Sequence, residues 1–337
     1  MTKVAVIGAG SWGTAVASIT ARNAPTWLWA RRRELAEQIE VEHRNGTYLP
    51  EITLPDTLHG TAELEEAVRD AEVVVMGVPS HGFRDVLAEA APYIAAGVPI
   101  ISLTKGVEQG SLKRMTEVIA DLLPGHPAGV LTGPNLAKEI LAGFPAASVV
   151  ALAEAGTCAD LQKLFSTDVF RVYTNPDVIG CEVAGALKNV MAIASGMADG
   201  MGFGDNTRAA LITRGLAELT RLGVALGGQP LTFSGLAGMG DLVATCISRQ
   251  SRNRHVGEEL GKGRTIEDIT TEMNMVAEGV KTSRAVVDLA AAHGVEMPIA
   301  EQVVAVLYEG KRASDVIASL MQRESRAELH GIADIDQ

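Results

Sequence analysis

Three glycines that directly follow a short apolar run constrain the fold of this chain more than any other feature. The run Lys3–Ile7 leads into Gly8, Gly10 and Gly13, and a helical pattern continues over Thr14–Arg22. In a Gly-x-Gly-x-x-Gly loop between a strand and a helix, the first glycine permits a tight turn and the second lets backbone amides approach a pyrophosphate. The third lets the helix pack closely on the strand. The spacing therefore predicts a dinucleotide-binding fold.

Short β-branched runs alternate with helical patterns through the first half of the chain. Buried apolar strands that alternate with helices are typical of a parallel, doubly wound sheet. We interpret residues 1–176 as a Rossmann-like dinucleotide-binding domain, and His43–Leu58, with Pro50 and Pro55, as a long surface connection. The predicted strands are Lys3–Ile7, Trp27–Ala30, Glu72–Met76, Ile100–Thr104, Gly129–Thr132, Ala147–Ala151 and Phe170–Tyr173.

The strand patterns stop after Pro176, and helical periodicity dominates the rest of the sequence. We expect residues 177–337 to form an all-helical substrate-binding and catalytic domain. The predicted helices are Asp177–Met201, Thr207–Leu222, Arg254–Leu260, Val280–His293, Ala300–Tyr308 and Ser314–Arg323.

Charge and composition exclude several classes of protein. With 29 Lys and Arg against 41 Asp and Glu, the net charge is −12, which disfavours nucleic acid and anionic membranes as partners. The uncharged stretch Val4–Ala21 superficially resembles a signal peptide, but glycines interrupt it, and no later segment reads as a membrane span. Cys158, Cys181 and Cys246 are sparse and unpaired, which favours a reducing cytoplasm. No His-x-x-x-His pair occurs, so we expect no metal site.

The second predicted strand ends in a basic triplet. An acidic residue at this place would bind the ribose 2′-hydroxyl of NAD, but the chain has Arg31, Arg32 and Arg33. Guanidinium groups can pair with a 2′-phosphate, so we predict a preference for NADP(H), with NAD(H) as a possible second cofactor. The alternative is that the three arginines are solvated residues at the start of a helix. In that case Glu34 would be the acidic residue of the NAD-binding pattern, shifted from its usual position.

Three further loops follow predicted strands, where ligands gather in such sheets. Gly77–Ser80 is expected to line the cofactor's path, and Lys105 could bind a substrate phosphate or carbonyl unless it is only a surface charge. Gly133–Ala137 presents backbone amides at a helix start, or is an ordinary turn.

Lys188 lies in a helical stretch whose neighbouring positions are small and apolar. Ala184, Gly185, Met191 and Ala192 are three or four residues from it. A desolvated amine has a lowered pKa suited to proton transfer. The alternative is a lysine that extends its ammonium group to solvent.

A glycine-rich turn delivers Asp241 at the start of an apolar helical stretch. Asp241 could be a helix N-cap, or it could be the partner of a buried lysine. Soon after it, Ser251, Arg252 and Asn253 open another helix and place a hydroxyl, a guanidinium and an amide at its N-terminus. This combination favours a small phosphorylated substrate.

Together these motifs resemble the bacterial NAD(P)-dependent glycerol-3-phosphate dehydrogenases, almost from end to end. The resemblance runs through GAGSWGTA, NGTYLP, TKGVE, GPNLAKE, EVAGALKNVMAIASGMADGMGFGDNTRAALITRGLAE, GLAGMGDL, SRNR and VAEGV. It implies an oxidoreductase with a 6-phosphogluconate-dehydrogenase-like architecture that reduces dihydroxyacetone phosphate to sn-glycerol 3-phosphate for phospholipid synthesis.

The resemblance also implies residue roles. Lys188 resembles the proton-transfer lysine, and Lys105 a lysine that contacts both substrate and cofactor. The implied substrate contacts are Gly133, Asp241, Ser251, Arg252 and Asn253, and the implied cofactor contacts are Ser11, Trp12, Arg32, Ala137, Arg252, Val276 and Glu278. Asn135, a further implied cofactor contact, stands where Ser or Thr is common in the family. The basic triplet also varies within the family, so Arg32 is the main cofactor contact among its three arginines. We also expect a homodimer, whose interface the apolar helical domain could bury.

Two rival functions fit the sequence less well. A β-hydroxyacid dehydrogenase of the phosphogluconate type would carry Lys-x-x-x-Asn on its catalytic helix, whereas Lys188 and Asn189 are adjacent. A non-catalytic dinucleotide sensor would not need Lys105, Lys188 and Asp241 together with a phosphate-binding helix start.

Overall fold

The computed structural model divides the chain into two compact units. The first comprises the residues up to Thr104 together with Lys113–Val178, and the second comprises Lys105–Leu112 and the residues from Ile179 onwards. The structure describes residues 3–273, 277–322, 324 and 327–328. The short segment that begins at Lys105 is therefore part of the second unit, although the sequence places it between two strands of the first.

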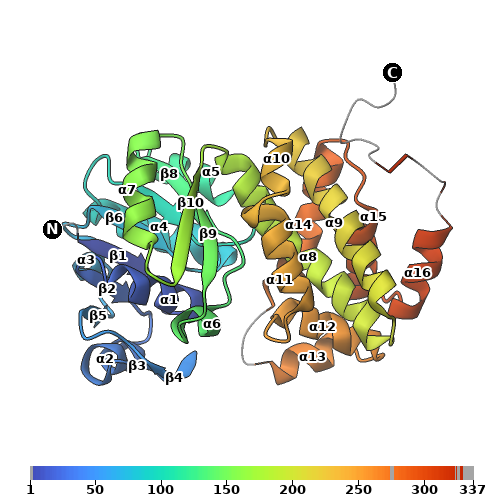
Figure 1. The fold of residues 1–337 in the computed structure, drawn as a ribbon, viewed down its shortest axis with the longest axis horizontal. Helices are drawn as coiled ribbons and strands as arrows, with labels where there is room; N and C mark the ends of the chain where they lie inside the picture. The colour runs from blue at the N-terminus through green and yellow to red at the C-terminus, as the bar shows by residue number, and fades with distance from the viewer. Residues whose placement is uncertain (1–2, 274–276, 323, 325–326, 329–337) are drawn as a thin grey trace. The chain divides into compact units, whose positions relative to one another are not determined.

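The first unit is built on an eight-stranded sheet of order β10-β9-β8-β7-β6-β1-β2-β5 (Figure 1). All seven predicted strands are present, and the Rossmann-like fold class is confirmed. The strands are β1 (Val4–Ile7), β2 (Thr26–Trp29), β5 (Leu58–Thr61), β6 (Val73–Met76), β7 (Ile100–Ser102), β8 (Ala128–Thr132), β9 (Ala146–Ala151) and β10 (Phe170–Asn175).

One strand pair departs from the predicted parallel arrangement. β8 and β9 run antiparallel, with Val130 opposite Ala151, whereas the other pairs in the sheet are parallel. The connection between them contains only α6 (Ala137–Leu141). A helix of this length covers about 7.5 Å, whereas β8 is about 17 Å long, so the helix is too short to return the chain to the far end of the sheet. The chain therefore enters β9 from the near end.

The stretch His43–Leu58 is not the plain surface connection that its prolines predict. It contains an antiparallel hairpin of β3 (Arg44–Asn45) and β4 (Leu49–Thr53), and β5 begins at Leu58. Pro50 lies inside β4, which pairs with β3 alone, and proline is tolerated in such edge strands. That part of the prediction is wrong.

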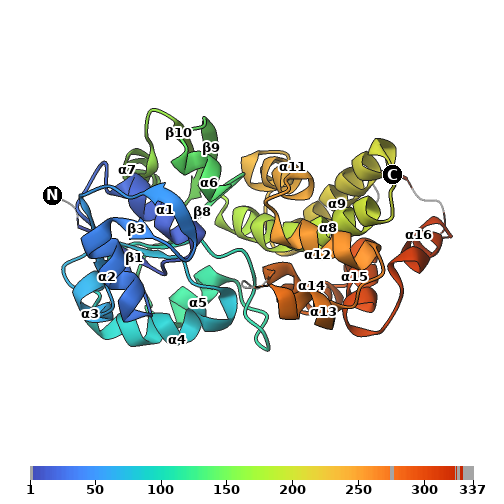
Figure 2. The same cartoon turned by 90° about the horizontal axis from the view of Figure 1, so that it is seen from below.

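Helices cover both faces of this sheet (Figure 2). Val4 and Val6 of β1 face one hydrophobic cluster and Ala5 and Ile7 face the other. The strand is fully buried, which explains its uninterrupted apolar sequence. The helices on the first face include α1 (Ser11–Thr20), α2 (Arg33–Glu42) and α7 (Ala155–Phe165), and those on the second are α3 (Leu64–Val68), α4 (Ser80–Ala90) with the short η1 (Ala91–Tyr93), and α5 (Met115–Leu122).

From Ile179 onwards, the regular elements of the described part of the second unit are all helices. All six predicted helices are present, and the apolar helical stretch expected at Asp241 is α11. Two further short helices, α10 and α13, and the π-helical turn η2 were not predicted. The elements are α8 (Val178–Gly200), α9 (Asp205–Ala225), α10 (Pro230–Phe233), η2 (Leu236–Gly240), α11 (Asp241–Ile247), α12 (Arg252–Gly261), α13 (Ile266–Glu272), α14 (Glu278–Ala292), α15 (Pro298–Tyr308) and α16 (Ala313–Met321).

The helix α8 is the centre of this unit. It is long and apolar enough to cross a membrane, but 89% of its apolar window is buried, as in the core helix of a globular domain. It packs on α12 with almost no space between the two backbones. A Cβ on Gly196 would lie 2.0 Å from the carbonyl oxygen of Arg254, and a Cβ on Gly257 would lie 2.0 Å from that of Ile193. These glycines hold the N-terminus of α12 close to α8.

Candidate active site

The glycine loop of the first unit has the geometry that a pyrophosphate needs. Gly8 has φ +114°, and a Cβ there would lie 2.6 Å from the carbonyl oxygen of Gly77. A Cβ on Gly13 would lie 2.0 Å from the carbonyl oxygen of Gly8, so only glycine lets α1 approach β1 this closely. Around Gly10 a Cβ would meet nothing within 4 Å, which leaves its backbone open to a ligand.

The N-terminus of α1 is available to an anion. Its N-cap is Gly10, which has no side chain to bind the first amides, and its first turn holds no acidic residue. Ser11 and Trp12 open the helix, and the buried indole Nε1 of Trp12 has no hydrogen-bond partner among the described residues. A phosphate group and polar atoms of a dinucleotide fit these unfilled donors.

Asn135 shows the same property on the loop after β8. Both polar atoms of its side chain are buried and lack a hydrogen-bond partner within the part of the chain that the structure describes. Such atoms cost about 1–3 kcal/mol each unless a ligand binds them. Asn135 precedes α6, which begins at Ala137, and follows Gly133, whose φ is +140°. This loop therefore carries an amide that a bound cofactor can satisfy.

The three predicted arginines differ in their surroundings. Arg31, Arg32 and Arg33 are all exposed, and the last two lie at the start of α2. Arg33 forms an ion pair with Glu63 at 2.5 Å. The carboxylate of Glu63 therefore partly compensates the charge of Arg33. Arg31 and Arg32 are the stronger candidates to attract a 2′-phosphate.

The second unit brings two lysines and one carboxylate together. Lys188 of α8 donates a hydrogen bond to Asp241 Oδ1, and Lys105 Nζ lies 2.6 Å from Asp241 Oδ2. Lys188 Nζ also donates to Thr245 Oγ1 at 2.7 Å, one turn further along α11. Asp241 is the first residue of α11 rather than its N-cap, which is Gly240, so the N-cap alternative is wrong. Each carboxylate oxygen accepts one ammonium group.

Burial sets the acidity of Lys188. Its side chain is 7% exposed and that of Asp241 only 2%. Burial lowers the pKa of Lys188 to about 7; the Asp241 carboxylate opposes this shift, and the Lys105 ammonium adds to it. The alternative of a lysine extended to solvent is therefore wrong. An amine with a pKa near neutrality can both give and take a proton.

The start of α12 carries the predicted phosphate-binding residues. Ser251 is the N-cap and its Oγ accepts from the backbone N–H of Arg254 at 3.2 Å, whereas the Arg252 side chain is exposed. Asn253 donates to Asn189 Oδ1 at 2.9 Å and accepts from the backbone N–H of Gly279 at 2.9 Å. The first turn of α12 is thereby held against α8 and α14.

Two residues near Lys188 were not singled out from the sequence. Thr245 lies four residues after Asp241, a spacing that places both on one face of a helix and could have indicated it. Asn189, which follows Lys188, also donates to the backbone carbonyl of Lys105 at 3.3 Å. Of the other predicted contacts, Glu278 begins α14 and Val276 lies outside the described residues.

Comparisons with known proteins agree along almost the whole chain. Family models described as the N-terminus and C-terminus of NAD-dependent glycerol-3-phosphate dehydrogenase match residues 3–158 and 177–318. A Sphingopyxis alaskensis protein named glycerol-3-phosphate dehydrogenase [NAD(P)+] 2 is 58% identical in sequence, and the match covers 97% of this chain and 98% of the relative's length. A Mycobacterium avium protein named glycerol-3-phosphate dehydrogenase [NAD(P)+] is 52% identical, and the match covers 98% of this chain and 97% of the relative's length. The crystal structure of a Coxiella burnetii glycerol-3-phosphate dehydrogenase matches with a TM-score of 0.92, at 38% identity over 96% of this chain and 99% of the other.

Proposed function

Because the chain belongs to the NAD-dependent glycerol-3-phosphate dehydrogenase family, a family of oxidoreductases, we propose that it reversibly reduces dihydroxyacetone phosphate to sn-glycerol 3-phosphate. The preferred cofactor is NADP(H), with NAD(H) as the second. In the cell this reaction supplies the backbone of glycerophospholipids. The observation that carries the proposal is the buried Lys188, held by Asp241 and Thr245, in a chain that also has a dinucleotide-binding loop.

The proposed catalytic and substrate-binding residues have distinct roles. When NADPH is bound, its nicotinamide supplies the hydride that reduces the C2 carbonyl carbon. Lys188, as an ammonium group, polarises the carbonyl oxygen and gives it the proton that completes the alcohol. Asp241 and Lys105 fix the position of the Lys188 amine. Arg252 and Asn253, with Ser251 and backbone amides including that of Gly133, hold the phosphate of the substrate.

Most of the proposed cofactor contacts lie on the first unit, and four residues, Lys105, Arg252, Val276 and Glu278, come from elsewhere in the chain. The pyrophosphate is bound by the glycine loop and the first turn of α1, and the 2′-phosphate by the basic triplet. The proposed contacts are Gly8, Gly10, Ser11, Trp12, Gly13, Arg31, Arg32, Arg33, Lys105, Asn135, Ala137, Arg252, Val276 and Glu278.

One spectrophotometric assay tests the proposed reaction. Addition of dihydroxyacetone phosphate to the protein and NADPH should oxidise the cofactor, and the absorbance at the NADPH band should fall. With NADP⁺, sn-glycerol 3-phosphate should reverse the change, whereas 6-phosphogluconate should not. NADPH should give a higher kcat/KM than NADH. A protein that turns over 6-phosphogluconate but not dihydroxyacetone phosphate would exclude the proposal, and so would one that binds NADPH without turnover.

Arg252→Ala should chiefly weaken substrate binding. Loss of a charge-assisted hydrogen bond of about 1.5–3 kcal/mol corresponds to a KM for dihydroxyacetone phosphate that rises by about 10- to 150-fold. The value of kcat should change much less, because the guanidinium holds the phosphate and not the carbonyl. Steady-state kinetics measures both constants.

Arg249→Ala is the matched control for this substitution. Arg249 is an exposed arginine three residues earlier, so its loss removes the same charge from the same region. Its KM should stay within about twofold of the wild-type value. If both variants raised KM equally, the effect would reflect the overall charge of the region and not a contact with the phosphate.

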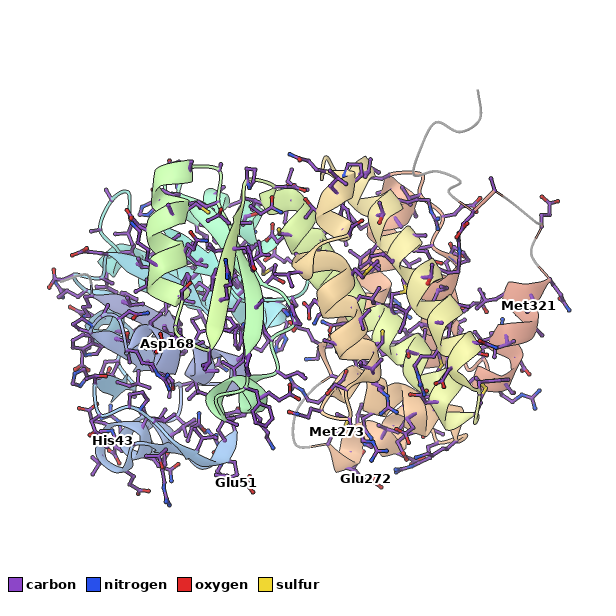
Figure 3. All side chains as sticks on the ribbon, in the orientation of Figure 1. His43, Glu51, Asp168, Glu272, Met273 and Met321 are labelled. Carbon is purple, nitrogen blue, oxygen red and sulfur yellow. The ribbon has the colours of Figure 1, made fainter. Side chains whose placement is uncertain are left out.

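We also propose that the protein is a cytoplasmic homodimer. The three cysteines are free and buried, which suits a reducing compartment. Exposed apolar side chains on the helical unit, such as Leu231 and Met321, offer surface that a second copy could cover; Met321 is labelled in Figure 3. Light scattering coupled to size exclusion measures the mass.

A further inference from the structure

The side chain of Asn45 is fully buried and ties the β3–β4 hairpin to the glycine loop. Its amide nitrogen donates to the carbonyl oxygen of Ala9 at 2.9 Å and to Thr14 Oγ1 at 2.8 Å, and its Oδ1 accepts from the backbone N–H of Tyr48 at 3.2 Å. An asparagine whose donors and acceptor are all engaged in a buried place is fixed in one orientation. The hairpin is thus joined by hydrogen bonds to the loop that would bind a pyrophosphate.

The hydrogen bond to Ala9 has a direct consequence for that loop. The carbonyl of Ala9 and the N–H of Gly10 belong to one planar peptide unit and point in opposite directions. When Asn45 holds the carbonyl, it also sets the direction of the N–H of Gly10, around which the backbone is open. Asn45 therefore orients a donor of the loop without lying in the ligand's path.

The same hairpin reaches the basic triplet. Thr47 Oγ1 accepts from Arg32 Nη2 at 3.1 Å, and the backbone N–H of Gly46 donates to Gln38 Oε1 at 2.9 Å, which holds the turn against α2. A hydroxyl orients the Arg32 guanidinium and leaves its charge intact. Arg33, in contrast, pairs with a charged group, because the carboxylate of Glu63 partly compensates its charge.

Apolar contacts keep the hairpin in place. Leu49 is 1% exposed, and Tyr48 and Ile52 pack against the same hydrophobic cluster as Trp12 of α1. Polar side chains of this region remain accessible to solvent: His43, which precedes β3, is half-buried, and Glu51 of β4 is exposed (both are labelled in Figure 3). The segment from Arg44 to Thr53 is thus fixed to α1 by a buried face.

We propose that the β3–β4 hairpin is a cofactor-binding element with two separable tasks. Asn45 positions the pyrophosphate-binding loop for either dinucleotide. Thr47 of the hairpin favours NADPH, because it orients Arg32 for a 2′-phosphate. Glu63, which lies outside the hairpin at the start of α3, opposes this preference, because it partly compensates the charge of Arg33. The inference rests on the proposed function only in taking NADPH and NADH as the ligands.

Binding of the two dinucleotides, measured by isothermal titration calorimetry at low ionic strength, tests the second task. Thr47→Val removes the acceptor at nearly constant volume and should raise the Kd for NADPH about 3- to 10-fold while that for NADH stays unchanged. Glu63→Gln should act in the opposite direction and lower the Kd for NADPH, again without effect on NADH. The two variants thus have effects of opposite sign on one ligand.

The first task is tested by Asn45→Asp with Thr14→Val as its matched control. The aspartate directs an oxygen at the Ala9 carbonyl and should raise the Kd for both dinucleotides about tenfold or more, with the KM for dihydroxyacetone phosphate unchanged. Thr14→Val removes only the other partner of Asn45 and should leave both Kd values within about twofold. Circular dichroism melting shows whether each variant folds, and if Asn45→Asp does not fold, Thr47→Val and Glu63→Gln decide the proposal.

The outcomes separate this inference from the proposed function. A wild-type protein that binds neither dinucleotide overturns the proposed function. If the protein binds both dinucleotides, but the ratio of the Kd for NADPH to the Kd for NADH is the same in Thr47→Val, Glu63→Gln and the wild-type protein, the inference alone is overturned. Equal weakening by Thr14→Val and Asn45→Asp also overturns the role of Asn45, because it would reflect general loosening of α1.

Discussion

Lys188→Met should lower kcat for dihydroxyacetone phosphate reduction by a factor of about 10² to 10⁴, the usual contribution of a general acid. The variant should fold, because methionine suits a site among small apolar neighbours, and Asp241 keeps its ion pair with Lys105 at 2.6 Å. The KM for the substrate should change little, since the phosphate is bound elsewhere. Steady-state kinetics on protein with an unchanged melting curve checks this.

The pH profile supplies the control for this substitution. The pKa of Lys188 is lowered to about 7, and the group that gives the proton is the ammonium form, which predominates below that pH. In the wild-type protein kcat/KM for reduction should therefore fall about tenfold per pH unit above about 7. The methionine variant should lack this limb. Near-normal turnover in a folded variant, or an unchanged limb, would exclude Lys188 as the proton donor.

The sequence predicted the elements whose patterns are local. The fully apolar run of β1 and the long periodicity of α8 could be read directly, because a buried strand and a core helix leave clear patterns. The two-residue strand β3 could not, because it is too short for any period to appear, and Pro50 in β4 indicates a loop. The antiparallel pairing of β9 with β8 depends on how short α6 is, and the sequence pattern did not predict where α6 ends.

The site was predictable in its unusual residues but not in its contacts. Lys188 stood out because a lysine among alanines and glycines is exceptional, and Asp241 because glycines precede it. Their pairing with Lys105, which is 136 residues from Asp241, arises only from tertiary structure. The role of Asn45 was invisible for the same reason, since its partners Ala9 and Thr14 lie more than 30 residues away.

Asp241→Asn should damage both stability and activity. The carboxylate is 2% exposed and lies between the ammonium groups of Lys105 and Lys188, so its neutralisation leaves two cations close together and away from water. Breaking a buried ion pair in this way costs about 3–5 kcal/mol of unfolding free energy. The pKa of Lys188 should fall further, because the carboxylate that raises it is lost while the repulsion from Lys105 remains.

The double variant Asp241→Asn, Lys188→Met separates these two effects. It contains one buried cation fewer, so it should regain most of the lost stability, as chemical denaturation would show. Its kcat should equal that of Lys188→Met, because the proton donor is absent in both. Activity of the single Asp241→Asn variant should partly recover at lower pH, where Lys188 is protonated again, whereas the double variant should not respond. If the stability losses of the two single substitutions simply added, the two side chains would not be coupled, and the assignment of Asp241 as the group that positions Lys188 would be wrong.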